Sequence, residues 1–414
     1  MKGSVLILGA AALQVPLISY VKSKGYKTIV VSIPGNYPGF AIADKSIYCD
    51  VRDSEKIYDA IREEDIVAVL TDETDISVPT VAKLTKRLGL SGNMPEVAST
   101  YSNKFAIRNV CTKIGVPVPN YFHTSSLTNI DKGIENISFP AIMKPEDNQG
   151  SRGIYVVKDK DDIETFFESS KRFSKTGNVI IENLFKGKEY VAEGFVVDGE
   201  YMNFGIAERK YFNIPGLFIP SQTIFPANIL DVNSKKIIES EIKIHKELHP
   251  NFGMTHSEYI VNEETGEYIL VETALRGGGV YISSHLVPLY TGIDNYDMLL
   301  KCSLGERLSL DNIRPKKNCK ASAYVCFYLP EGEIVEIDGI ISLHNIPQIK
   351  IADIQSLKIG MRTEKMVDKT KRLGPIIIQG DNRNEIDNLI KQVQQTLHIV
   401  VKTDDGRLED IKWD

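Results

Sequence analysis

Cysteine is scarce in this chain and is not arranged for disulfides or for zinc. The 414 residues include only five cysteines, an odd number, with no Cys-x-x-Cys pair and no histidine at zinc-ligand spacing. We therefore expect reduced thiols that serve mainly in packing. Positive charge is not in excess either, because the net charge is -6 at pH 7. The chain thus offers no basic field for nucleic acid or an anionic membrane, and we expect small-molecule partners.

Long apolar runs are absent as well. No segment approaches the roughly 20 apolar residues that a membrane-spanning helix needs, and no internal repeat or low-complexity tract occurs. The first residues enter a strand pattern too early for a signal peptide, so we expect a cytoplasmic protein. With 414 residues, 42% hydrophobic and 25% charged, the chain has the composition of a globular protein of about two to four structural units.

The first 95 residues alternate between strand and helix patterns. Strands are predicted at 4–8, 28–32 and 66–70, and helices at 14–24, 54–63 and 76–88. This alternation predicts a parallel sheet covered by helices, a Rossmann-like domain. The turn after the first strand, Gly9-Ala10-Ala11-Ala12, lacks the second and third glycines of a dinucleotide fingerprint, which disfavours NAD there.

A lysine and a glycine-rich loop follow a short apolar strand near residue 140. The strand carries Lys144 near its end, and the loop contains Gly150, Ser151 and Gly153. A partly buried ammonium needs an anionic partner, and free N–H groups in such loops wrap phosphate oxygens. A structural lysine beside an ordinary turn would have the same pattern. The adjacency of the two features favours a phosphate site.

Two glutamates flank a short linker further along the chain. Glu182 ends an apolar strand, Glu189 begins the next strand pattern, and Phe185 lies in the linker between them. Glu182 can accept a hydrogen bond from an adenine amino group, the backbone at Phe185 can bond the ring edge, and Glu189 can accept from ribose hydroxyls. The alternative is an exposed hinge with ordinary acidic residues.

An acidic hairpin is the most informative segment. Strands predicted at 255–261 and 268–276 carry Glu258 and Glu272, with Arg276 just beyond. Because side chains two apart share a face of a strand, a carboxylate on each strand can meet its partner across the pair. Two carboxylates and an arginine suit magnesium and a transferring phosphoryl group. A surface hairpin with unrelated acidic residues is the alternative.

In this order, these segments resemble the ATP-grasp superfamily over about residues 3–310. The resemblance implies a mixed α/β and α+β fold with four parts. They are a Rossmann-like pre-ATP-grasp domain at 1–95, an ATP-grasp small lobe at 96–185, an ATP-grasp large lobe with the metal site at 186–315, and a small C-terminal α+β domain at 316–414.

The resemblance also implies roles for individual residues. Lys104 and Lys144 would bind the phosphates of ATP under the loop of Gly150, Ser151 and Gly153, while Glu182, the Phe185 backbone and Glu189 would hold adenosine. Glu258 and Glu272 would bind Mg²⁺, with Mn²⁺ as an alternative ion. Arg276 and Gly279 would be catalytic, at the transferred phosphoryl or acyl phosphate.

One position departs from the family pattern. Many members have asparagine two residues after the second metal glutamate, where this chain has Ala274. A methyl group cannot ligate a hard cation, so the number of metal ions is left open. The following Arg-Gly-Gly-Gly run is similar to the branch of L-amino acid and dipeptide ligases.

The branch implies an ATP-dependent carboxylate–amine ligase that forms an amide through an acyl phosphate and releases ADP and phosphate. Its substrates would be a small carboxylate and an amine, and its relatives suggest a homodimer. Two alternatives are left open: a bicarbonate-activating enzyme that resembles carbamoyl-phosphate synthase or a carboxylase, and a nucleotide-binding regulatory protein without turnover. Four residues are substrate candidates: His256, Arg209, Gly278 and His285. The alternative is a structural histidine for His256 and for His285, and a solvated turn for Arg209.

Overall fold

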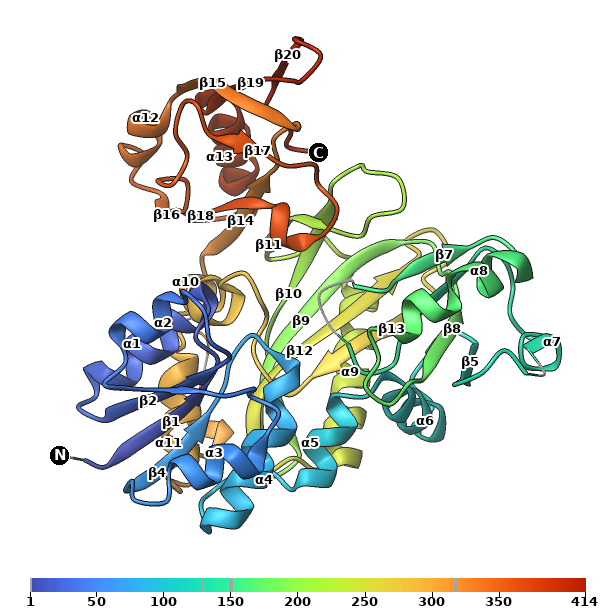
Figure 1. Cartoon of the computed structure of the whole chain (residues 1–414). Helices are drawn as coiled ribbons and strands as arrows, with labels where there is room; N and C mark the ends of the chain where they lie inside the picture. Colours follow the sequence, from blue (N-terminus) through green and yellow to red (C-terminus); the bar gives the residue numbers. More distant parts are fainter. Residues whose placement is uncertain (1, 129, 149–151, 314, 316–318) are drawn as a thin grey trace.

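The computed structural model describes residues 2–414 apart from 129, 149–151, 314 and 316–318. Within these residues the strands form four sheets. Figure 1 shows the N-terminal unit in blue and the small lobe in green-cyan on opposite sides of long green and yellow strands, with the orange-red C-terminal unit above them. In the part of the chain that the structure describes, no helix has the length and apolar character to cross a bilayer.

The N-terminal unit is a parallel sheet in the order β3-β2-β1-β4. All five residues of its strand Ser4–Leu8 are buried, as expected for a strand covered on both faces. The predicted alternation is confirmed, although β3, α2 and α5 were not predicted. The elements are β1 Ser4–Leu8, α1 Val15–Ser23, β2 Lys27–Ser32, α2 Pro38–Ile42, β3 Lys45–Tyr48, α3 Ser54–Ala60, β4 Ile66–Leu70, α4 Val78–Leu88 and α5 Pro95–Tyr101.

The small lobe is an antiparallel sheet in the order β5-β8-β6-β7 with helices beside it. Its first helix begins at Lys104, because the side chain of Asn103 accepts a hydrogen bond from the N–H of Ala106 at 2.9 Å. The elements are α6 Lys104–Ile114, β5 Tyr121–Thr124, α7 Ile130–Gly133, β6 Ala141–Pro145, β7 Tyr155–Val157, α8 Lys160–Lys171 and β8 Val179–Asn183.

The largest sheet has eight strands in the order β13-β12-β9-β10-β11-β14-β18-β16. Its last three strands belong to the C-terminal part of the chain, so the sheet continues across the predicted domain boundary between 315 and 316. The elements up to that boundary are β9 Lys188–Val197, β10 Glu200–Tyr211, β11 Pro220–Phe225, α9 Asp231–Leu248, β12 Phe252–Val261, β13 Tyr268–Ala274, α10 Val287–Thr291 and α11 Asn295–Ser303.

The C-terminal unit adds a small second sheet, β17-β15-β19-β20, and its own core. Helix α13 packs on β14 and β18 through Ile386, Leu389, Ile390 and Val393, which recur at helical spacing. The elements are β14 Ala321–Phe327, β15 Gly332–Asp338, α12 Ile340–His344, β16 Ile349–Ala352, β17 Arg362–Thr363, β18 Leu373–Gly380, α13 Arg383–Thr396, β19 His398–Lys402 and β20 Leu408–Asp410.

Candidate active site

A cavity of about 580 Å³ lies where the small lobe faces the largest sheet. It is lined from the small lobe, from the linker between β8 and β9, and from β10, β12 and β13. The segments that supply it are far apart in sequence. Several residues predicted from the sequence line this cavity together: Lys104, Lys144, Phe185, Glu189, Arg209, Glu258 and Glu272.

The two acidic strands pair in the predicted way. In the antiparallel ladder of β12 and β13, Glu258 stands directly opposite Glu272, and the register shifts just after Glu258. Directly opposed residues of such a ladder have their Cβ atoms about 4.5–5.5 Å apart. The expected meeting of the two carboxylate positions across the hairpin is therefore confirmed.

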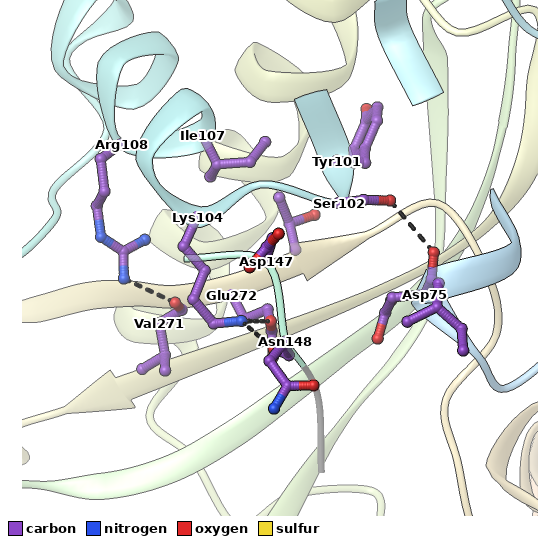
Figure 2. Close-up of a pocket in the computed structure, with 12 residues that line it drawn as sticks. Asp75, Tyr101, Ser102, Lys104, Ile107, Arg108, Asp147, Asn148, Val271 and Glu272 are labelled. Atoms are coloured by element: carbon purple, nitrogen blue, oxygen red, sulfur yellow. Dashed lines mark hydrogen bonds and ion pairs between the residues drawn. The ribbon is translucent and has the colours of Figure 1, made fainter. Parts of the chain in front are cut away.

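Each of these carboxylates contacts a basic side chain. The ammonium of Lys104 lies 2.8 Å from Glu272 Oε1 and donates to the carbonyl of Asn148 at 2.7 Å, as Figure 2 shows. Arg209 binds Glu258 through a short ion pair and Glu189 at 2.8 Å. Burial opposes the charge of Glu258, but Arg209 holds the pKa of Glu258 well below its usual range.

The residues present suit one hard cation bound together with phosphate. Magnesium commonly takes one or two carboxylates and completes its shell with phosphate oxygens and water. Glu258 and Glu272 supply those carboxylates at the cavity wall. Ala274, buried at 2% exposure, adds no oxygen. Among the described residues no cluster of three or more His, Cys, Asp or Glu side chains could hold a metal ion. The remaining ligands of Mg²⁺ would therefore come from the phosphates of a bound nucleotide and from water.

Lys144 is held in place by a buried carboxylate. Its ammonium lies 2.5 Å from Glu182 Oε2, and Arg108 Nε donates to Glu182 Oε1 at 2.6 Å. Burial by itself would raise the pKa of Glu182, but Arg108 and Lys144 lower it to about 2. Both oxygens of Glu182 are therefore engaged, and Glu182 does not line the cavity. This differs from the predicted contact with an adenine amino group and indicates a positioning role for Glu182.

The linker and the described residues Asn148 and Arg152 on either side of 149–151 line the same cavity. Phe185 lines it between β8 and β9. Gly153 has a φ of +75°, and a Cβ there would meet Phe173 at 2.8 Å, so this turn requires glycine. The predicted phosphate contacts of Gly150 and Ser151 lie outside the described residues.

Arg276 is fixed by the N-terminal unit. Its guanidinium donates to both oxygens of Asp75, from Nε at 2.8 Å and from Nη2 at 2.9 Å. Burial opposes ionisation of Asp75, but Arg276 lowers its pKa below the usual value. Asp72, which is fully buried just after β4, accepts a hydrogen bond from the N–H of Gly277 at 3.1 Å. The turn after β4 therefore positions both the arginine and the start of the glycine run.

The glycine run differs from one position to the next. The N–H of Gly278 donates to Glu193 at 3.4 Å, and a Cβ on Gly278 would lie 2.5 Å from Glu193 Oε1. A Cβ on Gly279 would meet nothing within 4 Å. Glu193 also binds His256, whose other ring nitrogen lies 3.3 Å from Glu258. Burial would lower the pKa of His256, but the Glu193 carboxylate raises it above its usual value.

Two family models match the chain. The ATP-grasp domain matches residues 137–284, which include most of the cavity wall and both opposed glutamates. The chain carries an ATP-grasp domain. A second model, the L-amino acid ligase C-terminal domain 2, matches residues 325–402.

Curated relatives align with most of the chain. Alanine–anticapsin ligase of Bacillus amyloliquefaciens is 23% identical over 394 residues, which cover 85% of this chain and 82% of that protein. The L-arginine-specific L-amino acid ligase of Bacillus subtilis is 23% identical over 349 residues, 81% of this chain and 80% of that protein. The solved L-amino acid ligase of Bacillus licheniformis superposes with a TM-score of 0.80 at 18% identity, over 97% of this chain and 99% of that chain, and shows the same fold.

The four substrate candidates differ in their position relative to the cavity. Arg209 and His256 lie beside Glu258, and Gly278 contacts Glu193. Arg209 is a buried residue of β10, not part of a solvated turn. His285 is half-buried, bonds the Ser284 hydroxyl at 2.8 Å and does not line the ATP-grasp cavity.

Some residues of the site were not predicted from the sequence. Asp72 and Asp75 follow the carboxyl end of parallel strand β4, which is where α/β sheets bind ligands, so the topology contained a signal for them. Glu193 lies four residues after Glu189 on β9 and therefore on the same strand face. No local pattern marked Arg108, which is buried at 1% exposure within α6.

Proposed function

We propose that the chain is an ATP-dependent carboxylate–amine ligase. The observation that carries this proposal is the opposed pair of Glu258 and Glu272 on a cavity that Lys104, Lys144 and Arg209 also line. Such a site has carboxylates for a metal ion and cations for phosphates. The match of residues 325–402 to the C-terminal domain of L-amino acid ligases supports an amino acid or a similar compound as substrate.

ATP would occupy the cavity with its phosphates between the two lobes. Lys104 and Lys144 bind phosphate oxygens, and Glu189 and the Phe185 backbone bind adenosine. Lys104 pairs with Glu272, and Arg209 pairs with Glu258. Binding therefore exchanges these internal ion pairs for contacts with phosphate and metal.

Glu258 and Glu272 would hold Mg²⁺, with Mn²⁺ able to use the same oxygens. Held by these two carboxylates, the ion would supply positive charge against the phosphate oxygens. Everything else is placement by the protein. Glu182 holds the ammonium of Lys144 at 2.5 Å. The side chain of Lys144 is therefore preorganised for phosphate binding.

The chemistry takes place in two steps. An oxygen of the substrate carboxylate attacks the γ-phosphorus, and the bond to the ADP oxygen breaks. The amine then attacks the acyl carbon, phosphate leaves with the electrons of the carbon–oxygen bond, and the ammonium proton is lost to solvent. Arg276, held by Asp75, and the N–H of Gly279 would stabilise the developing oxyanion. No side-chain nucleophile is required.

The acyl and amine substrates would lie toward the glycine run. Arg209 and His256, which contact Glu258, and Gly278, which contacts Glu193, are the proposed contacts, and His285 is a fourth candidate. We also infer a homodimer and cytoplasmic localisation for the enzyme.

Product analysis tests the proposal. Purified protein is incubated with Mg-ATP and pools of amino acids and small carboxylates, with and without bicarbonate, and ADP and product masses are measured. We expect ADP release that depends on a carboxylate and an amine together, with a product one water lighter than their sum. The Glu272→Gln variant serves as the inactive control.

Two other outcomes would contradict the proposal. ADP release that requires bicarbonate would favour a carboxylating or carbamoylating enzyme. ATP binding without ADP release in any pool would favour a nucleotide-binding protein without turnover. The C-terminal match to L-amino acid ligases favours amide formation over both.

A further inference from the structure

The C-terminal unit contributes a lysine to the proposed ATP cavity. Lys369 begins the short helix η5 (Lys369–Lys371) and lines the cavity together with Lys104, Lys144 and Glu258. Figure 1 shows this orange-red segment beside β11, above the strands that carry the acidic pair. A residue from outside the matched ATP-grasp region therefore completes the cavity wall.

The turn that carries Lys369 is held in a defined position. Asp368 caps η5 by accepting the N–H of Thr370 at 2.7 Å. At the other end, the guanidinium of Arg372 donates to the carbonyl of Pro220 at 2.8 Å and lies over the ring of Tyr324. The backbone on both sides of Lys369 is thus anchored, which directs its side chain toward the cavity.

Among the described residues, Lys369 lacks the carboxylate partner that the other buried or half-buried cations lining the cavity have. Lys104, Lys144 and Arg209 are each paired with a carboxylate. Within the described part of the chain, Lys369 is half-buried and forms no hydrogen bond or ion pair. Burial lowers the pKa of Lys369, the charges of Glu258 and Glu272 oppose that shift, and those of Arg209 and Arg372 add to it. An ammonium that is partly withdrawn from water without a partner favours an anionic ligand.

The composition of the acidic hairpin indicates why a further cation is useful there. Ala274 occupies the same strand face as Glu272, two residues on, and offers a methyl group where an oxygen could ligate a second ion. Glu258 and Glu272 alone suit one divalent ion, whereas a triphosphate carries more negative charge than one such ion neutralises. An ammonium from the C-terminal unit can supply the additional positive charge.

We propose that Lys369 is a phosphate-binding residue of the ATP site. Its ammonium donates to oxygens of the terminal phosphate on the side of Glu258, where a second metal ion would otherwise supply positive charge. The inference rests on the proposed function, because it takes ATP as the ligand of the cavity. It makes the C-terminal unit a part of the nucleotide site.

Nucleotide affinity tests the proposal without knowledge of the acceptor substrates. Dissociation constants for a non-hydrolysable ATP analogue and for AMP are measured by calorimetry in Mg²⁺ for the wild type, Lys369→Gln, Lys369→Arg and Lys391→Ala. Lys391 is an exposed residue of α13 and serves as the matched control. We expect Lys369→Gln to weaken the triphosphate analogue about tenfold or more, with most of the affinity restored in Lys369→Arg. AMP affinity and the unfolding temperature stay at wild-type values in all variants.

Other results would overturn the proposal in distinguishable ways. A wild-type protein that binds no ATP analogue would overturn the proposed function itself. Wild-type affinity for the analogue in Lys369→Gln would overturn only the role of Lys369. An equal loss of AMP and triphosphate affinity would make Lys369 a structural residue. A raised KM for the carboxylate substrate with unchanged affinity for the analogue would assign Lys369 to that substrate.

Discussion

A single carboxylate neutralises two buried cations beneath the proposed ATP cavity, and replacing it tests the construction of the site. The side chains of Glu182, Arg108 and Lys144 are exposed by only 4%, 1% and 7%. Glu182→Gln keeps the shape of the side chain and removes its charge. Both cations are then left without a buried counter-ion. Breaking a buried ion pair in this way typically costs about 3–5 kcal/mol.

The pKa of Glu182 gives a second magnitude. Burial raises it, but Arg108 and Lys144 together lower it from 4.5 to about 2. That shift corresponds to about 3 kcal/mol, at roughly 1.4 kcal/mol per pKa unit. Because the folded-state pKa lies below the unfolded-state value, the stabilisation is fully present above pH 4.5 and is lost as the pH falls toward 2.

Urea titration monitored by circular dichroism measures the effect. At pH 7 we expect Glu182→Gln to lower the free energy of unfolding by about 3 kcal/mol. Between about pH 5 and about pH 3 we expect the variant to lose less stability than the wild type, because it lacks the carboxylate whose stabilisation is lost there. The control is Asp59→Asn, which breaks a surface pair with Arg62 exposed at 57% and 61% and is expected to cost at most about 1 kcal/mol. Equal unfolding free energies for Glu182→Gln and Asp59→Asn would refute the reasoning.

Two further changes probe the arginine and the glycine run. Asp75→Asn removes the charged acceptor of Arg276. We therefore expect kcat of the ligase reaction to fall about 10- to 100-fold while the affinity for ATP stays unchanged. An unchanged kcat would mean that Asp75 does not position Arg276. Gly278→Ala places a Cβ 2.5 Å from Glu193 Oε1, so we expect the free energy of unfolding to fall by about 1–3 kcal/mol. The Cβ of Gly279→Ala has no atom within 4 Å, so we expect this variant to keep wild-type stability. Equal stabilities of the two variants would contradict this packing.

The parts of the site that lie on one hairpin or one strand end were predictable. Glu258 and Glu272 face each other because side chains alternate along a strand and a short turn sets which residues pair. Lys144 lies at the end of an apolar strand, and a strand of that kind is buried wherever it is placed. Both inferences need only neighbours in sequence.

The charge partners were not predictable in the same way. Arg276 and Asp75 are separated by 201 positions in the chain, and Arg108 and Glu182 by 74. Glu182 therefore looked available for adenine, although the fold engages both of its oxygens. Lys369 had no local signal either, because its position depends on the anchoring of Arg372 to Pro220.

By itself, the sequence determined the alternating N-terminal unit and the acidic hairpin, because strand and helix periodicity depends on residues within a few positions of one another. The reaction class followed from the resemblance to the ATP-grasp superfamily, which the order of the motifs carries. Only the tertiary structure decided which charges meet, that Arg276 is held by the N-terminal unit, and that the largest sheet extends into the C-terminal unit to bring Lys369 to the cavity. These features depend on how distant sheets pack against one another, and no local periodicity encodes that placement.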